Sequence, residues 1–315
     1  MLKKLLKQLY NDKNKGYMNL GYACINTIMS ANGIMTNRTM RRKTFEAKGL
    51  EYVSDLALLN VKDLKTIVQW NNEMKIKLFR LSSQIFPWSD DYKLSDLKDY
   101  EEICEIMLEV GEIATKAGQR LTMHPGPYNC LASPTPKVVA KTVRELNNHS
   151  EQFNMMGFKP SNYNKINIHV GGAYGDKSAT LARFVENFEL LNDDTKKRLV
   201  IENDDSPNEY SVKNLFDGIY QHIGIPITFD YFHHKFNDSG MTEEQALKMA
   251  AITWPEGVTQ CCHYSESRRK EKLDESIRPQ AHSDLIYEKI NTYGLNPDIV
   301  VEAKSKEQAI FKRVI

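Results

Sequence analysis

The stretch KINIHVG at residues 165–171 sets the pattern on which the fold of this chain depends. It is a short, largely apolar run, which indicates a buried β-strand, and its last residues are a histidine, a valine and a glycine. Seven further runs of this kind occur along the chain, at 18–23, 76–82, 120–124, 198–203, 225–230, 258–264 and 298–303. Helical patterns lie between them, most clearly at 50–73, 95–117, 135–156, 178–191, 211–223 and 242–251.

Eight strands that alternate with helices predict a parallel sheet, because parallel neighbours need a crossover connection. Eight such units favour a closed α/β structure, the (β/α)8 or TIM barrel. The chain has 315 residues, 41% of them hydrophobic, which is enough for one such barrel over residues 16–315, preceded by a basic amphipathic extension at 1–15. A doubly wound open sheet is the alternative, but no GxGxxG turn follows the first strand. Pro134 and Pro136 stand where one of the helices is expected to begin, and Thr242 where another is.

Composition excludes little about function. The net charge of +1 gives no overall argument for a nucleic-acid partner, so any basic surface must be local. Five cysteines without CxxC spacing indicate reduced thiols in an intracellular protein, and we see neither a signal peptide nor a transmembrane run. Two basic clusters on expected loops either contact DNA phosphates or are simply solvated: Arg38, Arg41, Arg42 and Lys43, and Arg268, Arg269, Lys270 and Lys272.

Ionisable side chains gather where the expected strands end. In a parallel barrel all these ends meet at one rim, the usual place of chemistry. Burying so many ionisable side chains without partners would be unfavourable. A cluster of divalent cations would offset this desolvation cost, because imidazole and carboxylate groups are ligands of such cations. Two or three clustered cations suit phosphodiester hydrolysis, although metal-dependent sugar isomerases use the same rim. The residues are His124, His169, Glu202, Asp230, His233, His263, His282 and Glu302.

The remaining histidines serve as a contrast. His149 and His222 fall in helical patterns and are expected on the surface. His234 either lines the site or packs beside it.

Several segments match a known family in order along the chain. They are LGYACIN, TNRT, FRLSSQIFP, HPGPY, HVGGAYGDK, ENDD, FDYFHH, AHSD and EAKSKEQA, between about Leu20 and Ala309. In these segments the chain resembles the UV-damage endonucleases, which are related in fold to the endonuclease IV type of abasic-site nuclease. The resemblance implies incision of double-stranded damaged DNA immediately 5′ of a lesion such as a pyrimidine dimer, with abasic sites as a further candidate substrate.

The resemblance also assigns roles to residues. It makes all eight rim residues metal ligands, with Glu202, Asp230, His263 and Glu302 at the catalytic centre. Glu202 would bridge two cations, the first also held by His124 and His169, the second by Asp230, His263 and Glu302, and a third by His233 and His282. Manganese is the family's usual metal, with magnesium or zinc as alternatives. Pro127 and Tyr128 would probe the lesion, and Tyr22 and Asn26 would line the pocket for the flipped-out base.

Three positions depart from the family pattern. Asp91, or Asp90, stands where a histidine often completes the first metal's shell. Pro127 replaces a common glutamine. Cys261 replaces a lysine that some members modify to a carbamate, so an altered metal preference or rate is a hypothesis. Two other functions therefore stay open: a xylose-isomerase-like sugar isomerase or epimerase, and a catalytically weakened DNA-damage-binding protein.

Overall fold

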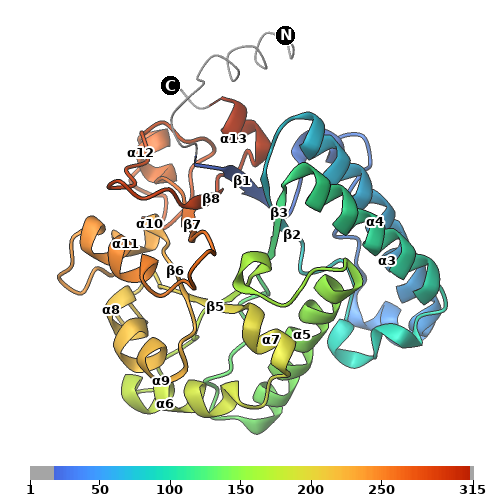
Figure 1. Cartoon of the computed structure of the whole chain (residues 1–315), viewed down its shortest axis with the longest axis horizontal. Coiled ribbons are helices and arrows are strands. Elements are labelled where there is room, and N and C mark those ends of the chain that lie inside the picture. The colour runs from blue at the N-terminus through green and yellow to red at the C-terminus, as the bar shows by residue number, and fades with distance from the viewer. Residues whose placement is uncertain (1–17, 313–315) are drawn as a thin grey trace.

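Eight parallel strands form the centre of the computed structural model, which describes residues 18–312 (Figure 1). Hydrogen bonds join the strands in the order β6-β5-β4-β3-β2-β1-β8-β7. A parallel bridge between Asp230 and His263, with the His263 amide donating to the Phe229 carbonyl at 2.9 Å, closes the ring between β6 and β7. The strands are β1 Leu20–Ala23, β2 Leu78–Leu81, β3 Arg120–Met123, β4 Ile166–Ile168, β5 Leu199–Glu202, β6 Ile227–Thr228, β7 Cys261–Tyr264 and β8 Asp298–Val301. The barrel prediction is confirmed.

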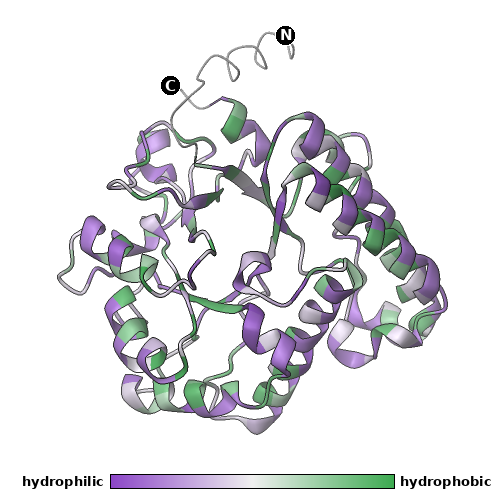
Figure 2. Ribbon diagram, in the orientation of Figure 1, coloured by the Kyte–Doolittle hydropathy of each residue, from purple (hydrophilic) through white to green (hydrophobic). Residues whose placement is uncertain are grey.

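Helices surround this barrel and carry hydrophobic and hydrophilic stripes (Figure 2). They are α2 Thr27–Ser30, α3 Arg42–Glu73, α4 Tyr100–Ala117, α5 Pro136–Met155, α6 Lys177–Phe188, α7 Asp193–Arg198, α8 Val212–Leu215, α9 Gln221–Ile223, α10 Tyr231–His234, α11 Glu243–Ala251, α12 Arg268–Lys272 and α13 Glu307–Phe311. The 3-10 turns η1 Ser89–Asp91, η2 Leu94–Asp96 and η3 Asn162–Asn164 lie between them, and the π-helical turn η4 Phe216–Tyr220 joins α8 to α9.

Both expected helix starts are confirmed. Pro136 begins α5, and Thr242 caps α11, where its hydroxyl accepts from the Gln245 amide at 3.2 Å. The helix expected from residue 50 begins there, because α3 consists of two helices that meet at Gly49, whose φ is 63°, and the first of them, from Arg42, was not predicted. Glycine adopts this left-handed conformation without the strain that a side chain would add.

Strand alternation creates two separate cores. Successive side chains of a strand point to opposite faces, so one set fills the barrel and the other packs under the helices. The inner side chains Ala23, Leu78, Val200, Cys261 and Val300 form an apolar cluster together with Trp254, which lies between α11 and β7. Two residues further along the same strands stand Arg80, Glu202, His263 and Glu302, which therefore point the same way at the rim. The apolar interior thus ends directly beneath a polar mouth.

Further predictions concerned the N-terminal extension and three histidines outside the predicted metal ligands. The extension at 1–15 lies outside the described residues. His149 is buried rather than exposed, because α5 turns the face bearing Thr142, Leu146, His149 and Phe153 toward the core. His222 is exposed as expected. His234 is buried and packs beside Phe229, with the ring centroids 5.4 Å apart. Among residues 18–312, no helix combines the length and the hydrophobicity that crossing a lipid bilayer requires.

Candidate metal centre

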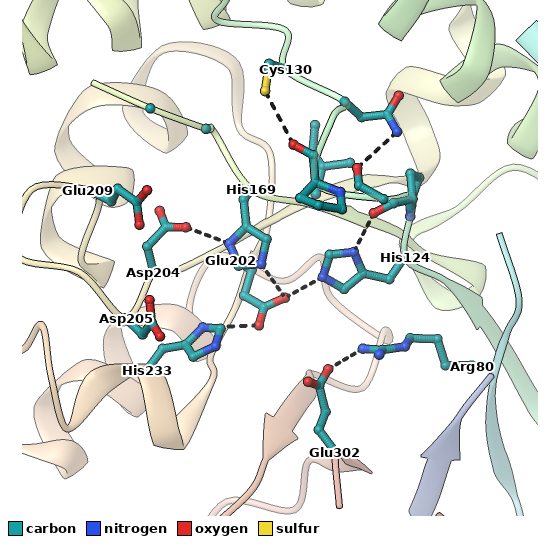
Figure 3. Close-up of a pocket in the computed structure, with 17 residues that line it drawn as sticks. Arg80, His124, Cys130, His169, Glu202, Asp204, Asp205, Glu209, His233 and Glu302 are labelled. Atoms are coloured by element: carbon teal, nitrogen blue, oxygen red, sulfur yellow. Dashed lines mark hydrogen bonds and ion pairs between the residues drawn. The ribbon is translucent and has the colours of Figure 1, made fainter. Parts of the chain in front are cut away.

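The rim encloses a cleft of about 540 Å³ (Figure 3). Five of the eight predicted ligands line it: His124, His169, Glu202, His233 and Glu302. His263 and Asp230 lie beneath, with no exposed surface. His282 adjoins through Glu302, since its ring Nδ1 lies 3.7 Å from that carboxylate. The structure therefore brings the whole predicted set to one end of the barrel.

Glu202 is the centre of this set. Its Oε2 lies 3.2 Å from His124 Nε2 and 3.7 Å from His169 Nε2. Its Oε1 lies 3.0 Å from His263 Nδ1 and 3.5 Å from His233 Nδ1. One fully buried carboxylate thus faces four imidazole rings, two with each oxygen (Figure 3 shows three of the contacts).

Donor atoms come close enough to share a cation in two groups. The first is His124, Glu202 and His263, and the second is His169, Glu202 and His233. In each group the three donor atoms lie within 4.8 Å of one another. Glu202 belongs to both, which is what a bridging carboxylate requires. The grouping of the histidines differs from the one that the resemblance implies, because His263 faces His124 across the barrel while His169 faces His233.

Backbone carbonyls orient three of the rings. His124 Nδ1 lies 3.0 Å from the Pro125 carbonyl, His233 Nδ1 lies 2.8 Å from the Asn203 carbonyl, and His282 Nδ1 lies 2.9 Å from the Glu302 carbonyl. A carbonyl oxygen only accepts, so Nδ1 carries the hydrogen and donates it. In the neutral rings of His124 and His282, Nε2 consequently keeps a lone pair that is free for a cation, and in His233 Nε2 offers one after the ring has lost its second proton.

Electrostatics in the first group favour a cation. Burial lowers the pKa of His124, and it lowers the pKa of His263 to about 3, so both rings are neutral at pH 7. Although burial opposes its ionisation, the neighbouring histidines hold the pKa of Glu202 well below the usual range. A ring-nitrogen lone pair at 3.2 Å from an anionic oxygen is unfavourable unless a proton or a cation lies between them.

The second group holds protons in the absence of cations. Although burial opposes protonation, Glu202 and Asp204 raise the pKa of His169 to about 10. Asp230 and Glu202 likewise raise the pKa of His233 to about 9 against the effect of burial. A cation that binds here must therefore displace protons.

Asp230 supplies a buried oxygen without a partner. Its Oδ1 accepts from the Phe232 and His233 amides at 2.7 and 2.8 Å, which caps α10. Its Oδ2 has no hydrogen-bond partner within residues 18–312. Burial raises the pKa of this carboxyl to about 7. An orphaned buried carboxylate oxygen beside imidazole donors is what a divalent cation would satisfy, so the residues fit such a centre.

A supporting layer of polar side chains escaped the sequence analysis. Arg80 pairs with Glu302, and against the effect of burial this cation lowers the pKa of the carboxyl. Asn167 donates to Glu202 Oε2. The fully buried Lys165 places Nζ 2.8 Å from Thr228 Oγ1 and 3.2 Å from His263 Nε2.

Strand alternation is the signal that could have found part of this layer. In KINIH, the residues at 165, 167 and 169 alternate with two isoleucines, so they share the inner face of β4. Burial lowers the pKa of Lys165, which lies at the floor of the site.

The two residues of the lesion-probing prediction lie on the loop between β3 and α5. Pro127 lines the cleft, and the Tyr128 side chain is 88% exposed beside it. A neighbouring loop supports this one, because Gly171 has a φ of 95° and an added Cβ would lie 2.9 Å from Cys130 Sγ. The close approach requires glycine.

Tyr22 and Asn26 do not reach the cleft. Alternation turns Tyr22 outward toward α3, where its hydroxyl donates to Asn71 Oδ1 at 2.8 Å and accepts from Asn26 Nδ2 at 3.0 Å. Asn26 Oδ1 in turn caps α2. Both residues are buried, so their position indicates packing rather than a pocket for a flipped-out base.

Asp91 does not reach the metal centre either. It is exposed and pairs with Arg42, while Asp90 pairs with Lys141 at 2.9 Å. Cys261 is fully buried in the apolar cluster inside the barrel.

The basic clusters are partly neutralised within the chain. Arg38 pairs with Asp63 at 2.6 Å, Arg269 with Glu275 at 2.9 Å and Lys272 with Asp284 at 2.6 Å. These carboxylates compete with phosphate for the same guanidinium and ammonium groups, and the role of the clusters in DNA contact stays a prediction.

The fold is a parallel barrel, and imidazoles and carboxylates surround one shared glutamate at the carboxyl ends of its strands. These features define a class of barrel proteins with a candidate polynuclear metal centre. The model of the UV-endonuclease UvdE family matches residues 18–314. The chain belongs to this family.

Individual UV-damage endonucleases are similar to this chain along most of its length. The chain is 36% identical over 304 residues to the UV-damage endonuclease of Schizosaccharomyces pombe, covering 93% of this chain and 49% of that protein, so it spans about half of its length. It is 31% identical to a putative UV-damage endonuclease of Acanthamoeba polyphaga mimivirus, covering 95% and 91%. A crystal structure of SacUVDE is 30% identical with a TM-score of 0.80, covering 94% and 96%.

A sugar epimerase shares only the fold. The D-psicose 3-epimerase of Clostridium cellulolyticum is 15% identical with a TM-score of 0.50, over 76% of this chain and 78% of its own. At that identity the likeness concerns the barrel and carries no activity.

Proposed function

We propose that this protein is a DNA repair endonuclease that hydrolyses the phosphodiester bond immediately 5′ of UV lesions. The observation that carries the proposal is the shared carboxylate of Glu202, each of whose oxygens faces two imidazole rings in a cleft that opens beside an exposed tyrosine. Two or three divalent cations, manganese before magnesium or zinc, fit the donor set. When bound, they would neutralise the scissile phosphate and acidify a water molecule for attack.

The chain's own residues then have separate tasks. Glu202, Asp230, His263 and Glu302 form the catalytic core, with His124, His169, His233 and His282 as further ligands. Arg80 holds Glu302 in place, and the backbone carbonyls fix the rings before any cation arrives. Because these groups are set by the barrel, little reorganisation is needed when substrate binds.

Lesion recognition would fall to the loop between β3 and α5. Tyr128 is free to stack on bases, since 88% of its surface is exposed, and an aromatic ring stacks on any base. Unstacking a damaged base step costs less free energy than unstacking an intact one. A tyrosine inserted at this place would therefore favour damaged steps. Pro127 limits the conformations of the loop that carries the ring.

The test uses a duplex with a single pyrimidine dimer and a label at the 5′ end of the damaged strand. Protein stripped of metal and then supplied with Mn²⁺ should release a fragment that ends at the bond 5′ of the dimer with a 3′-hydroxyl, and an undamaged duplex should stay intact. Retention of the duplex without cleavage would instead indicate a damage-binding protein. Turnover of ketohexoses without either would indicate a sugar epimerase.

A further inference from the structure

The tetrapeptide ENDD at 202–205 holds the site together beyond its glutamate. Glu202 contacts four rings, and Asn203 clamps the end of β6 by accepting from the Asp230 amide at 2.8 Å and donating to the Asp230 carbonyl at 3.1 Å. The next residue, Asp204, lines the cleft but belongs to neither donor group. Its carboxylate has a different neighbour.

Asp204 Oδ1 lies 2.7 Å from His169 Nδ1, on the far side of the ring from Glu202 (Figure 3). His124, His233 and His282 turn Nδ1 to backbone carbonyls, and His263 turns Nε2 to Lys165. Within residues 18–312, His169 is the member of the donor set whose outer ring nitrogen lies nearest to a carboxylate, at 2.7 Å, whereas His233 Nδ1 lies 3.5 Å from Glu202 and His282 Nδ1 lies 3.7 Å from Glu302. We propose that Asp204 is a positioning residue that fixes the ring of His169 for cation binding through Nε2.

The local structure makes Asp204 suitable for this task. Its side chain is 8% exposed, so solvent does not compete strongly for the carboxylate. Its amide donates to the Tyr210 carbonyl at 2.9 Å, and its Oδ2 accepts from the Tyr210 amide at 3.3 Å. These two bonds close the loop 204–210 on itself, which leaves Oδ1 directed at His169.

The chemistry follows from the two ring nitrogens. The contact of His169 Nδ1 with Asp204 is an ion pair at 2.7 Å that lacks the angle of a hydrogen bond, and because a carboxylate holds no proton of its own, the hydrogen of the pair lies on Nδ1 and Nε2 is left to face Glu202 at 3.7 Å. A carboxylate on the outer nitrogen makes the inner nitrogen a better donor and stops the ring from rotating, and loss of such a partner costs about 10- to 100-fold in metal affinity. Asp204 thereby acts on the cation through His169 and touches neither cation nor substrate.

Asp205 offers a matched control. It is the next residue, it carries the same charge and it also lines the cleft, but its ion-pair partner is Arg278, whose Nη2 lies 3.5 Å from Asp205 Oδ2. If acidic residues near the cleft merely attract cations, neutralising either aspartate has the same effect. If Asp204 positions His169, only the replacement of Asp204 weakens the binding of the one cation that His169 holds.

The experiment compares Asp204→Asn, Asp204→Leu and Asp205→Asn with wild type by calorimetric titration of metal-free protein with Mn²⁺. We expect Asp204→Leu to weaken one binding event about 10- to 100-fold. Asp204→Asn, whose amide oxygen still accepts, should weaken it less, and Asp205→Asn should titrate like wild type. Thermal unfolding of the metal-free variants checks that all of them fold.

A second readout reports the ring directly. In the Zn²⁺-loaded protein, which is diamagnetic, the His169 Nδ1 proton should appear as a slowly exchanging ring N–H signal in ¹H–¹⁵N correlation spectra. Asp204→Leu should remove that signal and keep those of His124 and His233, whose rings donate to backbone carbonyls. Retention of the signal in Asp204→Leu would overturn the proposal.

This inference rests on the proposed function, and the two fail differently. Wild type that neither binds Mn²⁺ nor cuts damaged DNA overturns both. Wild type that does both, while the Asp204 and Asp205 variants titrate alike, overturns the inference and leaves the proposed function standing.

Discussion

Replacing Glu202 by glutamine is the sharpest test of the centre. The substitution keeps the size and burial of the side chain but turns one of its oxygens into an NH₂ group. One oxygen faces His124 and His169, and the other faces His263 and His233. Whichever way the amide lies, one pair of rings meets a donor in place of a ligand.

The size of the effect follows from the charge that is lost. A shared anionic ligand that disappears should remove at least one cation, and a catalytic cation contributes several kcal/mol to the stabilisation of the transition state. With about 1.4 kcal/mol per factor of ten, a loss of about 3–5 kcal/mol corresponds to an incision rate lower by about 10²- to 10⁴-fold.

The assay combines single-turnover incision of the dimer-containing duplex with metal analysis of the same protein samples. Glu105→Gln on α4 serves as the control, since it makes the same chemical change at an exposed position on the outer helix layer. We expect Glu202→Gln to hold less Mn²⁺ per chain and Glu105→Gln to match wild type. A Glu202→Gln protein with full metal content and wild-type incision would refute the shared-ligand reasoning.

Four further predictions follow from the same geometry. Tyr128→Ala should lower the preference for damaged over undamaged duplex in competition binding without changing metal content; an unchanged preference contradicts its role. Mn²⁺ affinity should fall as pH falls below about 9, because His169 and His233, with pKa values of about 10 and 9, then hold protons that the cation must displace, each costing up to about tenfold per pH unit. An Mn²⁺ affinity that stays constant between pH 6 and 9 would contradict this coupling between proton release and cation binding. DNA binding should weaken steeply with added salt if the basic clusters meet phosphates, and a shallow dependence argues for solvated loops. Cys261→Lys should change the relative incision rates with Mn²⁺, Mg²⁺ and Zn²⁺, and identical profiles would discard the hypothesis that this position tunes metal preference.

Much of the site was predictable because strand geometry acts locally. In a parallel barrel the residue at the carboxyl end of each strand points to one mouth, so His124, Glu202 and His263 could be placed together without any knowledge of their contacts. The same alternation, applied to every second residue, would also have found Arg80, which stands on the inner face of β2, and Lys165, which directly precedes β4. Their roles were missed because Arg80 is not the last residue of β2, which ends at Leu81, and Lys165 lies at the opposite end of its strand from His169.

Other features depend on contacts that sequence does not encode locally. Asp204 meets His169 only because β4 and β5 are neighbours and the loop after β5 folds back at Tyr210. His149 has the helical spacing of the buried Leu146 and Phe153, but its polar side chain was expected on the surface, and the packing of α5 places it in the core. Tyr22 was placed at the cleft by resemblance, whereas alternation along β1 puts Ala23 inside and Tyr22 outside.

The balance of charge in the centre explains why so many ionisable groups can share it. Glu302 has a permanent partner in Arg80, so its charge is compensated whatever the state of the site. Asp230 has no such partner, and burial raises its pKa to about 7, so a proton occupies part of the place that a cation would take. His169 and His233 also hold protons, but for a different reason: neighbouring carboxylates, Glu202 among them, outweigh the effect of burial on the pKa of each ring. Cation binding is thus an exchange of several protons for fewer, more highly charged ions. The two apolar cores lie below the site and under the helices, so the barrel need not rearrange for that exchange to occur.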